Sequence, residues 1–208
     1  MGPTENVIET DPPTPAVVAH RAELDARRKA VRAELAAFVP AGAELVWEVG
    51  CGHGHFLTAY AAAHRDAQCV GVDTELDRIR RAVRKQERAR LSNLHFVRTE
   101  ARLFLEALPT DVTLAAVFVL FPDPWPKRRH HKHRLLQENF LRETAARAAP
   151  GTQFYFRTDH EPYFRAVESM LLEHADWRLA PGEPWPFERP TVFQARAAAH
   201  FSLVARRR

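Results

Sequence analysis

Short apolar runs alternate with amphipathic segments along most of the chain. The run VTLAAVFVL at 112–120 is almost entirely apolar and rich in β-branched residues, which is typical of a central strand covered on both faces. Further strands are expected at 44–50, 68–73, 95–98, 152–158 and within 197–208, and helices at 56–64, 75–88, 101–108, 135–148 and 163–174. This alternation indicates βαβ units, and therefore an α/β fold with a mostly parallel sheet and helices on both faces.

The beginning of the chain follows a different pattern. Residues 1–18 are rich in proline and acids with little to bury, which predicts a disordered or loosely packed tail before a single domain at 19–208. Residues 19–38 place Val31 and Leu35 at helical spacing, with cations on the other faces, and so predict a basic amphipathic helix. Either an ordinary surface helix or a direct role in gripping RNA fits this pattern.

Composition adds constraints on the partner and the compartment. The 208 residues carry a formal net charge of +4, and five permanent cations fall within eight positions at 127–134, which favours a polyanionic partner. Cys51 and Cys69 form no CxxC pair, so a disulfide framework or a zinc ribbon is not indicated. No apolar stretch approaches membrane-spanning length, so we expect a cytoplasmic protein with no membrane partner.

The segment FPDPWPKRRHHKHR at 121–134 concentrates the candidate chemistry. Asp123 stands between two prolines at the carboxyl end of the predicted central strand, where open α/β sheets bind ligands. A rigid acid beside an aromatic residue and a dense basic run indicates chemistry on a nucleobase. Trp125 offers either a stacking surface for a base or packing for the loop. The cations Lys127, Arg128, Arg129, Lys132 and Arg134 are expected to neutralise phosphates.

A glycine-rich turn follows the first strand. Glu48 precedes Gly50, Gly52 and Gly54, and a helix is expected directly afterwards. Glycines let the backbone pass close beneath a bound molecule. The GxGxG spacing departs from the GxGxxG of dinucleotide sites and favours S-adenosylmethionine (SAM), whose ammonium and sulfonium suit a nearby carboxylate. A plain strand-to-helix turn remains an alternative.

Two more acids end the next two strands. Asp73 closes the second strand, where an acid can accept hydrogen bonds from ribose hydroxyls, and Glu100 follows the third, placed to accept from an adenine amino group. Each alone could be an acid favoured by a helix N-terminus. Three acids at the ends of three successive strands indicate a cofactor site.

With these motifs, the chain from about Leu45 onward resembles the bacterial tRNA (guanine-N7-)-methyltransferases, the TrmB family. The most specific part is FPDPWPKRRHHKHRLLQ, supported by RTDHEPY at 157–163 and TVFQ at 191–194. The resemblance implies a class I SAM-dependent methyltransferase fold, Rossmann-like, with a seven-stranded sheet. It also implies transfer of the SAM methyl group to N7 of a guanine in the tRNA variable loop, position 46.

The resemblance assigns roles position by position. Its SAM-contacting acids match Glu48, Asp73, Glu100 and Asp123, its catalytic residue matches Asp123, and its substrate contacts match Lys127, Asp159, Thr191 and Gln194. The family usually has Glu at position 194, Glu at position 73 and Asp at position 100. Gln194 lacks a carboxylate for charge-assisted hydrogen bonds, so a catalytically impaired SAM- and RNA-binding relative is the alternative. A methyltransferase for small molecules or proteins fits the basic run poorly.

Histidines raise the question of a metal. His130, His131 and His133 lie in the basic run, and His53 and His55 in the glycine turn. No cysteine or acid stands at ligand spacing beside them, and methyl transfer from SAM needs no metal, so none is expected. The partner is expected to be tRNA, and the sequence is compatible with a monomer or a homodimer.

Overall fold

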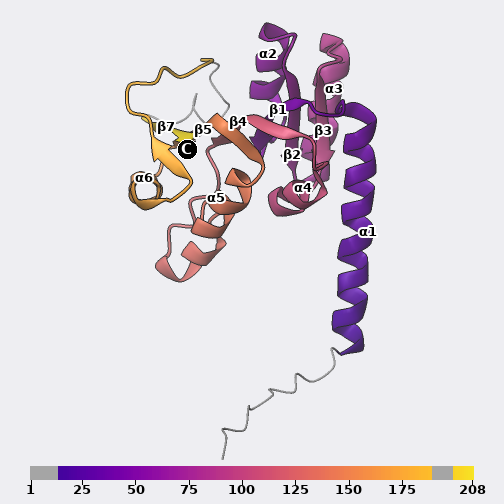
Figure 1. Cartoon of the computed structure of the whole chain (residues 1–208), viewed down its shortest axis with the longest axis horizontal. Helices are drawn as coiled ribbons and strands as arrows, with labels where there is room; N and C mark the ends of the chain where they lie inside the picture. Colours follow the sequence, from indigo (N-terminus) through magenta and orange to yellow (C-terminus); the bar gives the residue numbers. More distant parts are fainter. Residues whose placement is uncertain (1–13, 189–198) are drawn as a thin grey trace, which may run out of the picture.

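The computed structural model describes residues 14–188 and 199–208. Within these residues the strands form a seven-stranded sheet in the order β3-β2-β1-β4-β5-β7-β6 (Figure 1). The strands are β1 (Glu44–Val49), β2 (Gln68–Asp73), β3 (Leu94–Arg98), β4 (Thr113–Leu120), β5 (Ala148–Thr158), β6 (Trp177–Leu179) and β7 (Phe201–Arg207). The first five strands pair in parallel, and β7 runs antiparallel to both β5 and β6. The predicted mostly parallel α/β sheet is confirmed.

Helices cover both faces of this sheet. They are α1 (Pro15–Phe38), α2 (His55–Ala63), α3 (Leu76–Ala89), α4 (Ala101–Ala107), α5 (Glu138–Ala145) and α6 (Glu161–Glu173), with a 3₁₀ helix, η1 (Arg128–His133). One buried cluster joins α1, α4, α5 and α6 to one face, and a second joins α2 and α3 to the other. None of the helices in the described part of the chain is long and apolar enough to cross a membrane.

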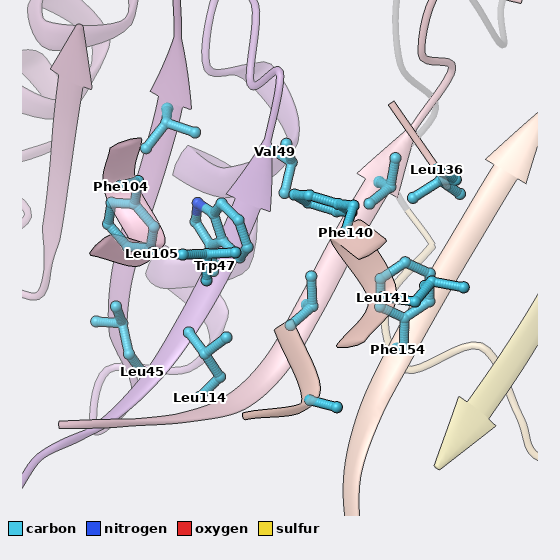
Figure 2. Close-up of a cluster of buried hydrophobic side chains, with 14 of the residues drawn as sticks. Leu45, Trp47, Val49, Phe104, Leu105, Leu114, Leu136, Phe140, Leu141 and Phe154 are labelled. Atoms are coloured by element: carbon cyan, nitrogen blue, oxygen red, sulfur yellow. The ribbon is translucent and has the colours of Figure 1, made fainter. Parts of the chain in front are cut away.

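The two cores follow from the alternation of side chains along the strands. Trp47 of β1 is fully buried and stacks on Phe104 of α4, with ring centroids 4.7 Å apart (Figure 2). Phe118 of β4 points to the opposite face, where it stacks on Tyr155 of β5 at 4.7 Å. Because both faces of β4 are covered, Val117, Phe118 and Val119 are fully buried, as the apolar run predicted.

Three element boundaries differ from the sequence predictions. α1 begins at Pro15, inside the segment expected to be a tail, and its first half extends beyond the sheet (Figure 1). α5 spans eight residues in place of the expected 135–148. β5 starts at Ala148, four residues early, because an irregularity in its pairing with β4 accommodates Pro150 and Gly151, which read as a loop in sequence.

Gly54, the last glycine of the loop after β1, lies where helix and sheet approach closely. Gly54 has φ +69°, and a Cβ there would lie 2.6 Å from Cζ of Phe96 and 2.7 Å from Cβ of Ala82. Gly42 has a similar φ of +71°, but a Cβ there would meet no atom within 4 Å. Both positions require left-handed backbone. Of the two positions, only position 54 also leaves no room for a side chain.

We expect Gly54→Ala to lower the free energy of unfolding by about 3 kcal/mol, since it combines left-handed strain with overpacking. Gly42→Ala, which adds strain without a clash, should cost about 1 to 2 kcal/mol. Chemical denaturation of both variants measures the difference. Equal losses would show that the helix can move away from Phe96 at no cost.

Candidate active site

A cleft of about 770 Å³ opens at the carboxyl ends of the parallel strands. It lies where the strand order reverses, because β1 connects onward to β2 on one side and β4 connects onward to β5 on the other. Such crevices are the usual ligand sites of open α/β sheets. Four acids predicted from the sequence line this single cleft, namely Glu48, Asp73, Glu100 and Asp123.

Glu48 is the deepest of these acids. It is 3% exposed, and its Oε2 atom has no hydrogen-bond partner among the described residues. Burial, followed by the charge of Asp73, raises the pKa of this carboxyl to about 8, although a backbone hydrogen bond from Leu57 opposes the shift. A buried carboxyl with one unpartnered oxygen in a cleft is suited to receive a cationic group, which would stabilise its ionised form.

Asp73 holds the glycine loop in place. Its Oδ2 accepts a hydrogen bond of 3.0 Å from the backbone N–H of Gly52, and its Oδ1 accepts one of 2.9 Å from Glu75. The guanidinium of Arg78 lies 3.6 Å from the same carboxylate. Since a carboxylate has about four acceptor positions, Asp73 can still accept from a ligand hydroxyl.

The glycines shape the loop between these acids. Gly50 and Gly52 both have positive φ, at +68° and +55°, and a Cβ on either would meet no protein atom within 4 Å. Their requirement within the chain is therefore conformational, and the space above them belongs to the cleft. Gly54, in contrast, serves close packing of α2 on the sheet.

Glu100 stands at the rim of the cleft. Its side chain is 61% exposed, makes no capping hydrogen bond to α4, and lies 3.7 Å from Arg27 of α1. Glu100 is nevertheless the N-cap residue of α4, so the alternative of an acid favoured by a helix N-terminus stays open. The ion pair places the basic helix α1 beside the cleft. Thr99, buried and also lining the cleft, was not identified from the sequence, where a lone Thr carries no signal.

Asp123 lies on a strained loop opposite the glycine turn. Phe121 and Trp125, on either side of it, have φ of +51° and +43°, conformations that bulky residues rarely adopt. The side chain of Asp123 is exposed and makes no hydrogen bond or ion pair with any residue that the structure describes. The loop thus holds a free carboxylate at the mouth of the cleft.

Arg134 corrects one expectation about the basic run. It is 7% exposed, its Nε donates a 2.8 Å hydrogen bond to the carbonyl of Pro124, and its guanidinium lies 4.6 Å from the centre of the Tyr163 ring. Arg134 therefore clamps the Asp123 loop and is not placed to neutralise phosphates. The other four cations, Lys127, Arg128, Arg129 and Lys132, are exposed on or next to η1.

The surroundings of Trp125 bear on the two interpretations left open by the sequence, a stacking surface for a base and packing for the loop. Its ring contacts those of His130 and His133, with centroids 5.8 Å and 5.2 Å away. The side chain nevertheless remains 38% exposed and lines the cleft. The histidines therefore contact one part of the indole, and the exposed part belongs to the lining of the cleft.

Two of the four predicted substrate residues can be placed relative to the cleft. Lys127 and Asp159 are exposed and do not line it, whereas Thr191 and Gln194 fall outside the described residues. The chain leading to those two is anchored by Arg157, which pairs with Glu188 at 3.0 Å and lies 3.9 Å from the centre of the Trp185 ring. Because Arg157 is 4% exposed, this anchor is buried at its base.

The thiol of Cys51 and the possibility of a metal site can both be assessed in the described part of the chain. Burial, followed by the charges of Glu48 and Asp73, raises the pKa of Cys51 well above its usual value, so the thiol stays protonated. Across residues 14–188 and 199–208, no group of three or more His, Cys, Asp or Glu is arranged to hold a metal ion.

We expect Arg134→Ala to destabilise the protein by about 1 to 3 kcal/mol, because it removes a charged hydrogen bond to a buried loop carbonyl. Arg128→Ala, six residues earlier on exposed η1, should change the free energy of unfolding by no more than about 0.5 kcal/mol. Urea denaturation compares the two. Similar values would mean that Arg134 is an ordinary surface cation.

The raised pKa of Glu48 predicts a pH dependence. The folded state holds a proton on Glu48 that the unfolded state loses above its usual pKa of 4.5, so this group reduces stability as pH rises from about 5 to 8. The slope is at most about 1.4 kcal/mol per pH unit. Glu48→Gln should remove it, with the variant gaining on the wild type toward pH 8. Denaturation curves between pH 5 and 9 measure this, and parallel profiles would show that Glu48 is ionised in the folded state.

Comparisons with known proteins identify the family. The model of a family described as "Putative methyltransferase" matches residues 42–199. The chain is 38% identical over 127 residues to the tRNA (guanine-N(7)-)-methyltransferase of Syntrophotalea carbinolica, covering 61% of this chain and 55% of that protein. It is 31% identical over 163 residues to the protein of the same name from Nitrosococcus oceani, covering 78% and 69%. The chain spans 55% to 61% of the length of three of the curated relatives.

Solved structures share the fold at low identity. The 16S rRNA methyltransferase KamB superposes with a TM-score of 0.58 at 17% identity, covering 88% of this chain and 93% of that one. TrmN from Thermus thermophilus gives 0.58 at 15% identity, covering 86% and 48%. The fold is that of the class I SAM-dependent methyltransferases, and the chain belongs to the bacterial tRNA (guanine-N7-)-methyltransferase family, TrmB.

Proposed function

We propose that this protein transfers the methyl group of SAM to N7 of a guanine in tRNA, in the variable loop at position 46, giving 7-methylguanosine. The observation that carries the proposal is the placement of Asp123, a free carboxylate on a strained loop at the mouth of a cleft lined by three further acids. Curated relatives that bear the name of this activity support it. We place the reaction in the cytoplasm.

The cleft fits SAM by its donors and acceptors. Glu48 offers a buried, unpartnered oxygen to the ammonium group, and Asp73 retains acceptor positions for ribose hydroxyls. Glu100 at the rim is exposed and suited to the adenine amino group. When bound there, SAM supplies an electrophilic methyl group on its sulfonium.

The chemistry asks the protein to position the base. Guanine N7 carries a lone pair and no proton, so no general base is needed. We assign Asp123 to orient the guanine by accepting hydrogen bonds from its N1 and N2 donors, and to balance the positive charge that the purine gains. The exposed part of Trp125 provides a stacking surface beside it.

Substrate contacts extend from the cleft along the loops around it. The cations Lys127, Arg128, Arg129 and Lys132 are placed to bind phosphates in a sequence-independent manner. Asp159, at the end of β5, and Thr191 and Gln194 are assigned to the substrate by their match to the family's motifs. The anchored loop through Glu188 leads toward the latter two.

The proposal is tested by methyl transfer from labelled SAM to unmodified tRNA transcripts. We expect label on a transcript with guanine at the variable-loop position and none when that base is adenine. Asp123→Asn should lower kcat at least about 10²-fold and weaken SAM binding to a smaller extent, because the base loses an acceptor that orients it and the cofactor loses one of the four acids lining the cleft. Asp66→Asn, an exposed carboxylate outside the cleft, is the matched control and should leave kcat unchanged.

Two other outcomes would revise the proposal. No label on either transcript, with SAM binding intact, would favour a catalytically impaired relative that binds SAM and RNA. Full turnover by Asp123→Asn would remove Asp123 from the site while leaving the activity.

A further inference from the structure

A second hollow lies on the face of the molecule that carries α2 and α3. It is a groove of about 400 Å³ lined by residues about one helical turn apart on each helix. They are His55, Thr58, Ala59 and Ala62 of α2, and Lys85, Arg88 and Ala89 of α3. The alanines make the floor shallow, and two cations, a hydroxyl and an imidazole surround it. This donor set suits an oxyanion the size of a phosphate.

The groove joins the cofactor cleft through shared residues. His55 lines both hollows, and Arg78, at the start of α3, lines the cleft. From Arg78 the positions 81, 85 and 88 follow at helical spacing, so one side of α3 presents four cations in a row. The row spans eleven residues, from Arg78 to Arg88, or about 15 Å along the helix.

Arg78 of this row pairs with Asp73, but the other three cations have no acid paired with them in the described part of the chain. α3 contains six Lys or Arg residues and two acids, a surplus equal to the +4 formal charge of the whole chain. Within the described residues Arg81, Lys85 and Arg88 form no ion pair, whereas Arg165 on α6 pairs with both Glu161 and Glu168. The Lys85 ammonium donates a 2.8 Å hydrogen bond to the carbonyl of His53 and so is held at the groove.

Mutual repulsion and an unused hydroxyl mark the groove as incomplete. Desolvation and the charges of Arg88, Arg81 and Arg84 lower the pKa of Lys85, so these cations lie close enough to repel one another. The hydroxyl of Thr58 is buried without a hydrogen-bond partner in the described part of the chain, although helical threonines can bond the preceding turn. An anion in the groove would relieve both conditions.

We propose that the α2/α3 groove is a phosphate subsite for the RNA substrate, with Lys85, Arg88 and Thr58 as its donors and the row from Arg78 to Arg88 as the track to the cleft. The inference rests on the proposed function for its partner. Among the described residues no Phe, Tyr or Trp lines the groove, whereas cations and a hydroxyl do, so a backbone phosphate is the part of RNA that fits best.

The test is the double variant Lys85→Gln/Arg88→Gln, measured by binding of a fluorescent unmodified tRNA transcript and by methyl transfer. We expect Kd for tRNA to rise at least about fivefold at 0.1 M salt, and the slope of log Kd against log salt to fall by about 1 to 2. Saturating tRNA should restore kcat, and KM for SAM should not change, because the groove lies outside the reacting centre.

The matched control is Arg80→Gln/Arg84→Gln, which removes the same charge from α3 at positions that do not line the groove. Its Kd should rise less than twofold, and the melting temperatures of both variants should stay close to that of the wild type, since relief of like-charge repulsion offsets the loss of the Lys85 hydrogen bond in one variant and of the Arg80–Asp77 ion pair in the other. Equal weakening in the two variants would overturn a specific subsite and leave a diffuse charge effect. Thr58→Val, with the charges kept, should weaken tRNA binding about twofold to threefold.

Further outcomes separate this inference from the proposed function. If the wild type binds tRNA without methylating it, and the double variant binds more weakly, the subsite stands and the proposed activity fails. Methylation with unchanged tRNA affinity in the double variant would overturn the subsite alone. Inorganic phosphate could stabilise the wild type but not the double variant, while both bind tRNA equally well. That result would overturn the RNA subsite and assign the groove to a small phosphate.

Discussion

The arrangement of the site depends on the divergence of two neighbouring parallel strands. β1 and β4 pair side by side, but their connections leave in opposite directions, so a crevice remains between their carboxyl ends. Glu48 lies at the bottom of this crevice because it belongs to β1 itself, and Asp123 lies at the mouth because it follows β4 on a loop. Depth explains why two acids at the ends of adjacent strands differ so much in exposure.

Acidic and basic side chains occupy different parts of the surface around the cleft. The acids line the cleft, where they favour the cationic cofactor of our proposal and repel phosphates. Of the exposed cations on η1 and α3, Lys132 and Arg78 line the cleft and the others lie outside it. A polyanionic substrate is therefore attracted to the rim and excluded from the interior, except for a neutral base that can enter. Such an arrangement directs the substrate by repulsion as well as attraction.

The sequence predicted what depends on local pattern. The strand-end acids and the glycine loop converge because parallel strands end at one edge, a rule that needs no tertiary detail. The prediction that Arg134 neutralises phosphates was wrong. The sequence of a basic run does not reveal that one of its cations is buried against the Tyr163 ring and the Pro124 carbonyl. β6 was missed because it has only three residues, and the start of β5 was missed because the irregularity around Gly151 reads as a loop. The roles given to Lys127 and Asp159 stay predictions, because neither side chain reaches the cleft.

The loop that carries Asp123 shows how the fold positions a carboxylate without touching it. The backbone N–H of Phe121 donates a 2.7 Å hydrogen bond to the carbonyl of Arg157, which extends the β4–β5 ladder to the point where the loop begins. Arg134 holds the loop three residues later through the carbonyl of Pro124, and positive φ at Phe121 and Trp125 bends the chain on either side of Asp123. The side chain of the same Arg157 anchors Glu188 and Trp185. One residue at the end of β5 therefore sets the positions of two segments that meet the substrate in our proposal, so a shift of β5 would move both together and preserve their spacing.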